Sequence, residues 1–315
     1  VKILQKELNF LEETIYVTYQ TFGLPMNSNA PIILVNHALT GNSQVTEANG
    51  WWKEIVGHAK VIDLNRYCVI SINIVGNGFD KDERHLINDI KAWSTWKIAS
   101  VFWYVLDKLK VKELYAIIGG SIGGAIAWEM SFLRPCNVQH LIPIASSYQA
   151  SDWIIGLVHV QEQILNLGVD TLPLARQHAM LFYRTPLDLK QKFNIQMEEE
   201  TGLYKVQSWL NHHGKELEKR FAYYSYRLMN HLLSTIGQTL TINRLNQFAR
   251  DFKGKISLIA IDSDLFFTAE EQLEQYKILK SLNICIDYQL IKSPHGHDAF
   301  LIEHEQLHKI LNPSF

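Results

Sequence analysis

Short apolar runs alternate with amphipathic stretches along much of the chain, and this alternation predicts a sheet flanked by helices. Residues 100–109 place apolar side chains at helical spacing, which indicates an amphipathic helix that crosses from one strand to the next. Buried strands that alternate with helices are typical of a mostly parallel sheet. Six runs have the length and composition of such strands, and they cover residues 31–36, 67–72, 114–118, 141–145, 256–261 and 284–291.

Residues 150–247 depart from this alternation. They contain no convincing strand pattern, and stretches such as 207–233 combine helical spacing with many aromatic and charged residues. The strand pattern returns at residue 256. We therefore expect a core formed by residues 1–149 and 248–315, into which residues 150–247 are inserted as an all-helical cap, or lid.

The composition fits a soluble enzyme and argues against several other classes. The 315 residues, 47% of them hydrophobic, are enough for one large domain with an insertion, whereas the net charge of −2 argues against nucleic acid as a partner. No apolar run approaches the roughly 20 residues of a membrane span, and residues 1–8 lack the continuous apolar core of a signal peptide. We therefore expect a cytoplasmic protein with no membrane partner.

The cysteines and histidines do not suggest a metal site. Cys68, Cys136 and Cys285 are too few and too widely spaced for a disulfide framework or a zinc site, and we expect them to be small buried hydrophobic side chains. The pair His212 and His213 does not change this expectation, because adjacent residues of a helix point in different directions. We therefore expect no metal.

The motif with the clearest chemistry is a serine framed by glycines, directly after the third predicted strand. Residues 119–124 read Gly-Gly-Ser-Ile-Gly-Gly and contain the pattern Gly-x-Ser-x-Gly around Ser121, followed by a helix-like pattern. A serine at such a sharp turn needs glycines beside it, because a Cβ there would clash with the neighbouring strand or helix. The backbone N–H of Ile122 then points from the helix N-terminus to where an oxyanion would form. We interpret this turn as a nucleophile elbow.

An acid and a histidine follow this serine in the order that an α/β-hydrolase requires. Asp262 and Asp264 come directly after the fifth predicted strand. His295 and His297 follow the sixth. The carboxyl ends of parallel strands meet at one edge of a sheet, so a serine, a carboxylate and an imidazole can converge there. We therefore predict an α/β-hydrolase fold, with a mostly parallel central sheet flanked by helices and an inserted all-helical cap.

Five sequence blocks in order resemble the homoserine O-acyltransferases of the acetyltransferase type, which are methionine-pathway members of the α/β-hydrolase superfamily. Five linked blocks arise by chance far less often than one short motif. Residues 76–86 depart from the family, because they are shorter and more charged than its usual glycine- and serine-rich stretch. The resemblance otherwise covers nearly the whole chain, and its blocks are residues 36–41, 50–52, 119–124, 263–267 and 296–300.

The resemblance implies a catalytic triad and an oxyanion hole at defined positions. The implied groups are Ser121 as nucleophile, Asp264 as triad acid, His297 as general base, and the backbone N–H groups of Leu39 and Ile122 as oxyanion donors. Asp262 is the alternative to Asp264 as acid. We expect His295 to be a loop residue and His37 to shape the oxyanion loop.

The resemblance also implies an amino-acid site formed by Arg176, Tyr183 and Asp298. Arg176 and Tyr183 are seven positions apart, about two helical turns, and would share one face of a cap helix. The planar guanidinium of an arginine can bond both oxygens of an α-carboxylate, while Asp298 would receive the α-ammonium group. Without the resemblance, the same pattern fits a solvated arginine and a tyrosine packed in the core.

The function implied by the resemblance is transfer of an acetyl group from acetyl-CoA to the hydroxyl of L-homoserine, in two steps through a serine acyl-enzyme. Acetyl-CoA would be a co-substrate, with no permanently bound cofactor, and the chain would form a homodimer through its helical cap. A serine esterase of the same fold, a succinyl donor and serine as acceptor remain alternatives. A non-catalytic binding protein is disfavoured, because all three triad residues are present.

Overall fold

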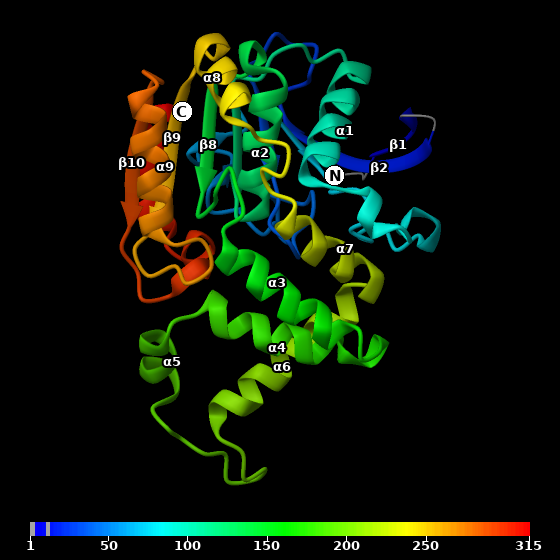
Figure 1. The fold of residues 1–315 in the computed structure, drawn as a ribbon, viewed down its shortest axis with the longest axis vertical. Helices are drawn as coiled ribbons and strands as arrows, with labels where there is room; N and C mark the ends of the chain where they lie inside the picture. The colour runs from blue at the N-terminus through cyan, green and yellow to red at the C-terminus, as the bar shows by residue number, and fades with distance from the viewer. Residues whose placement is uncertain (1–3, 11–12) are drawn as a thin grey trace.

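The computed structural model describes residues 4–10 and 13–315, and one large sheet lies at its centre (Figure 1). The strands of this sheet follow the order β1-β2-β6-β3-β7-β8-β9-β10. Two short strands, β4 (Val56–Gly57) and β5 (Ile62–Asp63), pair apart from it. The strands of the large sheet are β1 (Leu4–Phe10), β2 (Glu13–Gly23), β3 (Ile32–Asn36), β6 (Cys68–Ile72), β7 (Ala116–Gly120), β8 (His140–Ile144), β9 (Lys255–Ile261) and β10 (Ile286–Ile291).

The sheet is mostly parallel, as the sequence predicts. Each neighbouring pair from β6 to β10 is parallel, whereas β2 pairs antiparallel with both β1 and β6. The six predicted strands correspond to β3 and β6 to β10, and their ends differ from the prediction by at most two residues. The antiparallel pair of β1 and β2 is an addition to the predicted sheet.

Both faces of the sheet are covered. Neighbouring residues of one strand point to opposite faces and therefore pack in different clusters. Leu34 and Ile117 pack in a cluster with residues of α1, α2 and α9. Their neighbours Ile33 and Ile118 pack in a second cluster that includes Trp52 and residues of α10. Burial on both faces explains the unbroken apolar runs of these strands. The helices of the core are α1 (Thr95–Lys108), α2 (Ile122–Leu133), α8 (Ile242–Asp251), α9 (Ala269–Ser281) and α10 (His304–Leu311).

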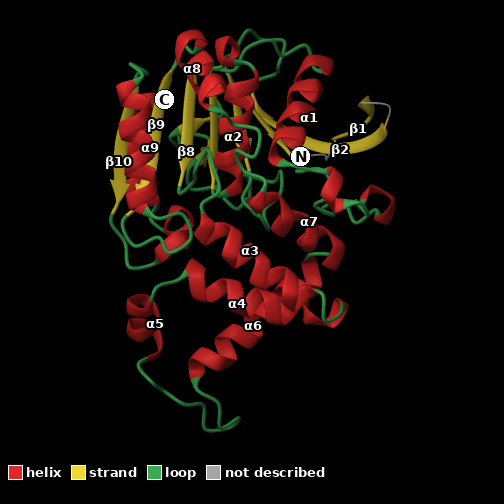
Figure 2. Cartoon of the chain, viewed as in Figure 1, coloured by secondary structure: helices red, strands yellow, loops and turns green. Residues whose placement is uncertain are grey.

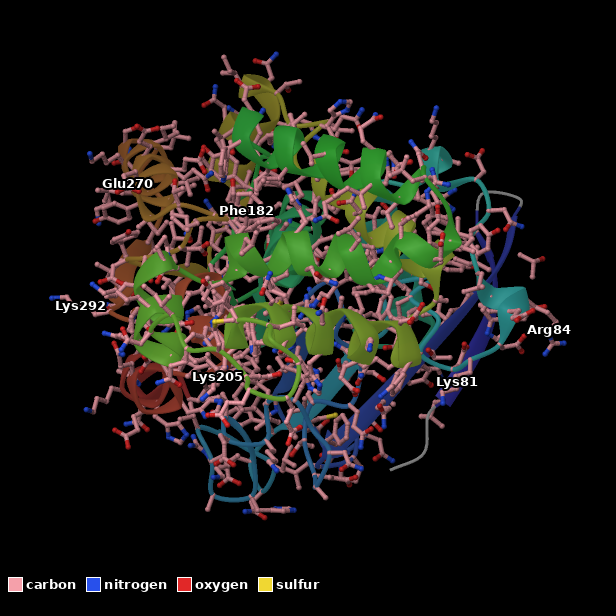
Figure 3. The ribbon with its side chains drawn as sticks, turned by 90° about the horizontal axis from the view of Figure 1, so that it is seen from below. Lys81, Arg84, Phe182, Lys205, Glu270 and Lys292 are labelled. Carbon is pink, nitrogen blue, oxygen red and sulfur yellow. The ribbon has the colours of Figure 1, made fainter. Side chains whose placement is uncertain are left out.

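The chain between β8 and α8 forms a layer of helices at the carboxyl ends of the strands (Figures 1 and 2). Seen from below, α3, α4 and α6 cross the molecule side by side, with Phe182 near the middle (Figure 3). This layer therefore covers the edge of the sheet at which the residues after β7, β9 and β10 meet. Its helices are α3 (Asp152–Leu165), α4 (Leu172–Tyr183), α5 (Pro186–Phe193), α6 (Lys205–Arg220) and α7 (Tyr223–Ser234).

The limits of these helices differ in detail from the sequence pattern. The predicted cap boundary at 247–248 falls inside α8, which packs on the core through Phe248 and the ring of Phe132 on α2, with 4.9 Å between ring centroids. The helical stretch expected at 207–233 is divided between α6 and α7. In the part of the chain that the structure describes, no helix is both long enough and apolar enough to cross a membrane.

The cysteines differ in their exposure. Cys68 is buried in β6, but Cys136 and Cys285 are exposed, so the expectation of burial is wrong for these two. Cys136 lies in the short 3₁₀ helix Pro135–Asn137, and Cys285 directly precedes β10, an edge strand with several solvent-facing side chains. Among residues 4–10 and 13–315, no group of three or more His, Cys, Asp or Glu side chains could hold a metal ion.

Candidate active site

Ser121 lies at a sharp turn between β7 and α2. It caps the N-terminus of α2 with φ of 58° and ψ of −132°, and it is only 4% exposed. A positive φ is rare for a residue with a side chain, so the surrounding structure must hold this conformation. One such restraint is the backbone N–H of Ser121, which donates to the carbonyl oxygen of Ile144 in β8 over 2.9 Å.

The glycines around the serine are required by close packing. A Cβ at Gly119 would lie 2.5 Å from the carbonyl carbon of Gly123. One at Gly123 would lie 2.6 Å from the carbonyl oxygen of Asn36, and one at Gly120 would lie 2.4 Å from the ring of Phe300. The elbow therefore touches both the loop after β3 and the segment after β10, from which the other candidate residues come.

The loop after β3 is held by the buried ring of His37. Its Nδ1 donates to the carbonyl oxygen of Ala38 (2.8 Å), and its Nε2 accepts from the backbone N–H of Ile74 (3.0 Å). Burial lowers the pKa of His37 to about 4, so the ring is neutral and its role is to shape the loop. Among the described residues, the backbone N–H groups of Leu39 and Ile122 donate to no other protein group. Both could therefore donate to an oxyanion.

Asp264 and His297 lie side by side after neighbouring strands. Nδ1 of His297 donates to Oδ2 of Asp264 over 2.8 Å. The other carboxylate oxygen, Oδ1, accepts the backbone N–H groups of Phe266 (2.7 Å) and Phe267 (3.0 Å). This arrangement fixes the carboxylate and leaves Nε2 of the imidazole as the proton acceptor.

His297 lies in an aromatic surround. Its Nε2 is buried and, within the described residues, has no hydrogen-bond partner, which suits an atom that meets a reacting group. A bond between Nε2 and Ser121 is absent from the described contacts, and catalytic hydrogen bonds are often long without substrate. The rings around the imidazole, with centroids 5.1 to 5.8 Å from its own, are those of Tyr183, Phe266, Phe267 and Phe300.

The alternative residues have other partners. Asp262 is exposed, and its Oδ1 accepts the backbone N–H of Ser293 over 3.0 Å. Nδ1 of His295 lies 2.6 Å from Oδ1 of Asp188 at the start of α5. The geometry therefore brings Asp264, and not Asp262, to the imidazole of His297.

A pocket of ≈ 400 Å³ opens between the core and the cap. Its lining includes Thr40, which follows Leu39 in the loop after β3, and Asp298, which follows His297. Burial raises the pKa of Asp298, while the positive charges of Arg176 and Arg184 act in the opposite direction. The cap contributes three arginines to this lining, Arg176, Arg184 and Arg220.

Arg176 is the arginine of this pocket that has neither an ion pair nor a hydrogen bond among the described residues. Its guanidinium lies 5.4 Å from the centroid of the Tyr183 ring, consistent with residues two turns apart on α4. Arg184 pairs with two carboxylates, and Arg220 donates to the carbonyl oxygen of Thr40 over 2.8 Å. In the described part of the chain, no carboxylate forms an ion pair with Arg176. This side chain is therefore available to an anionic ligand.

Tyr183 faces the imidazole rather than the large pocket. Its ring centroid lies 5.5 Å from that of His297, and burial raises the pKa of its hydroxyl. Together with Leu39 and Phe266 it lines a separate, smaller cavity of ≈ 10 Å³ between the cap and the core. The structure thus places Arg176 and Asp298 in the large pocket, whereas Tyr183 lines the small cavity.

Arg184 and Arg220 are charged pocket residues to which the sequence assigns no role. Arg184 directly follows Tyr183, so its position beside the expected site was visible in the sequence. Arg220 ends α6 and contacts Thr40, which is 180 positions away in the chain. No local pattern could have indicated that contact.

Comparison with known proteins agrees with the fold. A family model described as alpha/beta hydrolase fold matches residues 31–304. The chain therefore belongs to the α/β-hydrolase fold family, as its sequence predicts. Curated relatives named homoserine O-acetyltransferase are 26–30% identical to it over 91–98% of its length. The one from Cyclobacterium marinum is 30% identical, with 91% of this chain and 85% of the relative aligned. Within the fold family, the chain is thus homoserine O-acetyltransferase-like.

Solved structures with the same fold include both transferases and esterases. A homoserine O-acetyltransferase from Bacillus anthracis has a TM-score of 0.83 at 17% identity, covering 99% of this chain and 96% of its own. Esterase E22 has a TM-score of 0.85 at 17% identity, covering 99% of this chain and 98% of its own. At this identity, both likenesses show the fold alone.

Proposed function

We propose that the protein is an acyltransferase that moves an acetyl group from acetyl-CoA to the hydroxyl of L-homoserine, a step of methionine biosynthesis. The observation that carries this proposal is the pocket beside His297, which holds an unpaired guanidinium, Arg176, and a carboxylate, Asp298. An amino acid carries the complementary pair of charges on one carbon atom. The homoserine O-acetyltransferase relatives support the same role.

The chemistry would use Ser121, His297 and Asp264 as a triad. His297 takes the proton from Ser121, whose Oγ attacks the thioester carbonyl carbon of acetyl-CoA. The oxyanion is bound by the backbone N–H groups of Leu39 and Ile122, and the C–S bond then breaks to release CoA with a proton from His297. In the second step His297 takes the proton from the hydroxyl of homoserine, whose oxygen attacks the acyl carbonyl carbon. The bond from this carbon to Oγ of Ser121 then breaks, and His297 returns the proton to Oγ.

The acceptor would be oriented by its own charges. The guanidinium of Arg176 presents two donors to the α-carboxylate, and Asp298 meets the α-ammonium group. A bound acceptor places its hydroxyl beside the acyl-enzyme at high effective concentration, which lets it compete with water. The cap excludes much of the solvent from this position.

A serine esterase is the second candidate, because esterases of this fold share the architecture. The two activities differ in what removes the acyl group from Ser121, the amino acid or water. An esterase has no use for a carboxylate clamp such as Arg176.

The test is to follow both half-reactions. Incubation with acetyl-CoA alone should add one acetyl group to the protein by mass spectrometry, and Ser121→Ala should prevent it. Homoserine should then discharge the acyl-enzyme much faster than water does, while succinyl-CoA and serine should perform poorly as donor and acceptor.

Arg176→Lys separates transfer from hydrolysis. It keeps the charge but loses the bidentate fork, so acylation should persist while transfer to homoserine falls about tenfold to a hundredfold. Equal discharge by water and homoserine in the wild type would favour the esterase. Failure of Ser121 to react with a fluorophosphonate would favour a non-catalytic binding protein.

A further inference from the structure

The segment that joins α4 to α5 is fastened to the loop that carries His297 and Asp298. Thr185 Oγ1 donates to the carbonyl oxygen of Pro294 over 2.5 Å. A Cβ at Gly296 would lie 2.9 Å from the carbonyl oxygen of Tyr183, so the two backbones are in close contact. The cap and the histidine loop therefore form one connected unit at this point.

Arg184 lies within this connection and bridges two carboxylates. Its Nε donates to Oδ2 of Asp188 over 2.8 Å, and its Nη1 lies 3.6 Å from Oδ2 of Asp298. Asp188 is in turn held through Oδ1 by His295. The side chain of Arg184 is 12% exposed, so its ion pairs are poorly screened by solvent. Arg184 is thereby fixed by Asp188 and reaches Asp298 from a defined side.

The carboxylate of Asp298 is engaged by protein at one oxygen. The structure gives Oδ2 its ion pair with Arg184, and within the described residues no hydrogen bond or ion pair involves Oδ1. The second oxygen is therefore available to a ligand in the pocket.

The charge of Asp298 depends on its neighbours. Burial favours the protonated form of this carboxyl and raises its pKa, and nearby cations oppose this effect. A protonated Asp298 would no longer attract an ammonium group. The charged or titratable groups that face it are Arg176 and Tyr183 on α4, Arg184 after α4, Arg220 at the end of α6, and its neighbour His297.

We propose that Arg184 is a positioning residue for the acceptor, which anchors Asp298 by one carboxylate oxygen so that the other receives the ammonium group of the amino acid. This inference rests on the proposed function of the pocket. Arg184 itself need not touch the substrate, because its Nε and Nη1 already face Asp188 and Asp298. Its effect reaches the reaction through Asp298 alone.

The expected result of Arg184→Gln is a defect confined to the second half-reaction. Acylation of Ser121 by acetyl-CoA should proceed at the wild-type rate, while the KM for homoserine rises roughly tenfold or more. Because Asp298 loses a neighbouring cation, it should become protonated at a higher pH. The acidic limb of transfer to homoserine should therefore move to higher pH, whereas that of acylation stays in place. Arg184→Lys should retain part of the transfer to homoserine that Arg184→Gln loses.

A double-mutant cycle tests whether Arg184 acts through Asp298. In an Asp298→Asn background, Arg184→Gln should add little further loss. The matched control is Arg227→Gln, which removes another cap arginine from an ion pair, that with Glu162, outside the pocket. The control should leave both half-reactions and their pH profiles unchanged.

Three outcomes would overturn the inference. These are an unchanged KM and pH profile in Arg184→Gln, an equal slowing of acylation and transfer, and a full additional loss in the Asp298→Asn background. The wild type reports separately on the proposed function. If wild-type protein transfers acetyl groups to homoserine and the Arg184 variants behave as it does, only the role of Arg184 fails. If the wild type itself does not transfer to homoserine, the proposed function fails.

Discussion

The proposed chemistry depends on Asp264, the carboxylate that is hydrogen-bonded to His297. Two backbone N–H groups fix Oδ1 of Asp264, so Oδ2 can hold the imidazole in one tautomer. Asp264→Asn should preserve the fold but permit the wrong tautomer, with a loss of turnover on the order of 10⁴. Asp262→Asn is the matched control, because Asp262 is exposed and, within the described residues, bonds only a backbone N–H of the neighbouring loop. If Asp262→Asn lost most of its turnover and Asp264→Asn kept nearly all of it, Asp262 would be the triad acid.

His37 makes the stability of the protein dependent on pH. Burial lowers the pKa of its ring to about 4 in the folded protein, below its ordinary value of 6.5 in the unfolded chain. The unfolded chain therefore takes up a proton first, and about 3 kcal/mol of stability is lost as the pH falls from about 6.5 to about 4. Above about 6.5 this contribution is fully present.

Urea unfolding at several pH values measures this effect. In His37→Gln, unfolding should take up about one proton fewer, so the free energy of unfolding should fall less steeply between neutral and acidic pH. The stability of this variant at neutral pH will also be lower. The decline should not vanish, because burial also lowers the pKa of His140, to about 3. Identical pH dependence in the wild type and the variant would contradict the role assigned to His37.

The sequence could indicate single residues where a motif fixes them. Ser121 follows from its glycines, because their close packing is a property of the turn itself. The choice of Asp264 over Asp262 depended on the family motif, since both carboxylates follow the same strand. Arg184 lies next to an expected site residue, but its proposed role depends on ion pairs with Asp188 and Asp298. The sequence pattern does not bring these two carboxylates together.

At the scale of elements, the junction of β7 and α2 places the elbow against the oxyanion loop. A Cβ at Gly123 would lie 2.6 Å from the carbonyl oxygen of Asn36 and 2.7 Å from that of His37. Gly123→Ala should therefore push α2 away from this loop, cost about 1–3 kcal/mol of unfolding free energy, and slow both half-reactions.

Gly156 on α3 provides the control for this substitution. No atom lies within 4 Å of a Cβ built there, so Gly156→Ala should stabilise its helix by up to about 1 kcal/mol and leave the activity unchanged. Thermal unfolding and acylation rates of the two variants give the comparison. A harmless Gly123→Ala would mean that the start of α2 can move without consequence for the oxyanion donors.

Elements buried on both faces of the sheet were predictable, and those at its margin were less so. The runs that form β3 and β6 to β9 are continuous and apolar, because helices and loops cover both their faces. The pair of β1 and β2 extends the sheet beyond these covered strands, and β2 mixes polar and apolar residues. Its signal is therefore weaker than that of a central strand.

At the scale of the whole molecule, the pocket is a product of the cap meeting the core. Thr40, Arg176, Arg220 and Asp298 come from four distant parts of the chain and line one cavity. The sequence could predict that a cap lies over the serine, but not which cap side chains reach the loop after β3. That depends on how α4 and α6 pack on each other and on the core.

The cap also presents an apolar surface that a lone chain would leave in water. Leu174 and Leu181 are 49% and 44% exposed and lie about two turns apart on the same face of α4, which crosses the middle of the cap (Figure 3). Exposed apolar side chains that share one face are typical of an interface. We therefore predict a homodimer in which this face of α4 packs against a second copy of the chain.

The double variant Leu174→Glu and Leu181→Glu tests this prediction, because an interface that closes on unpaired carboxylates is strongly destabilised. Light scattering should give twice the mass of one chain for the wild type and the mass of a single chain for the variant. Ile242→Glu, at an 80% exposed position of α8 outside the cap, should leave the dimer intact. Neither leucine lines the pocket, so the variant should still react with a fluorophosphonate at Ser121, which separates loss of the dimer from loss of the fold. A wild type that stays monomeric at assay concentration, or a doubly charged variant that stays dimeric, would exclude this face of the cap as the interface.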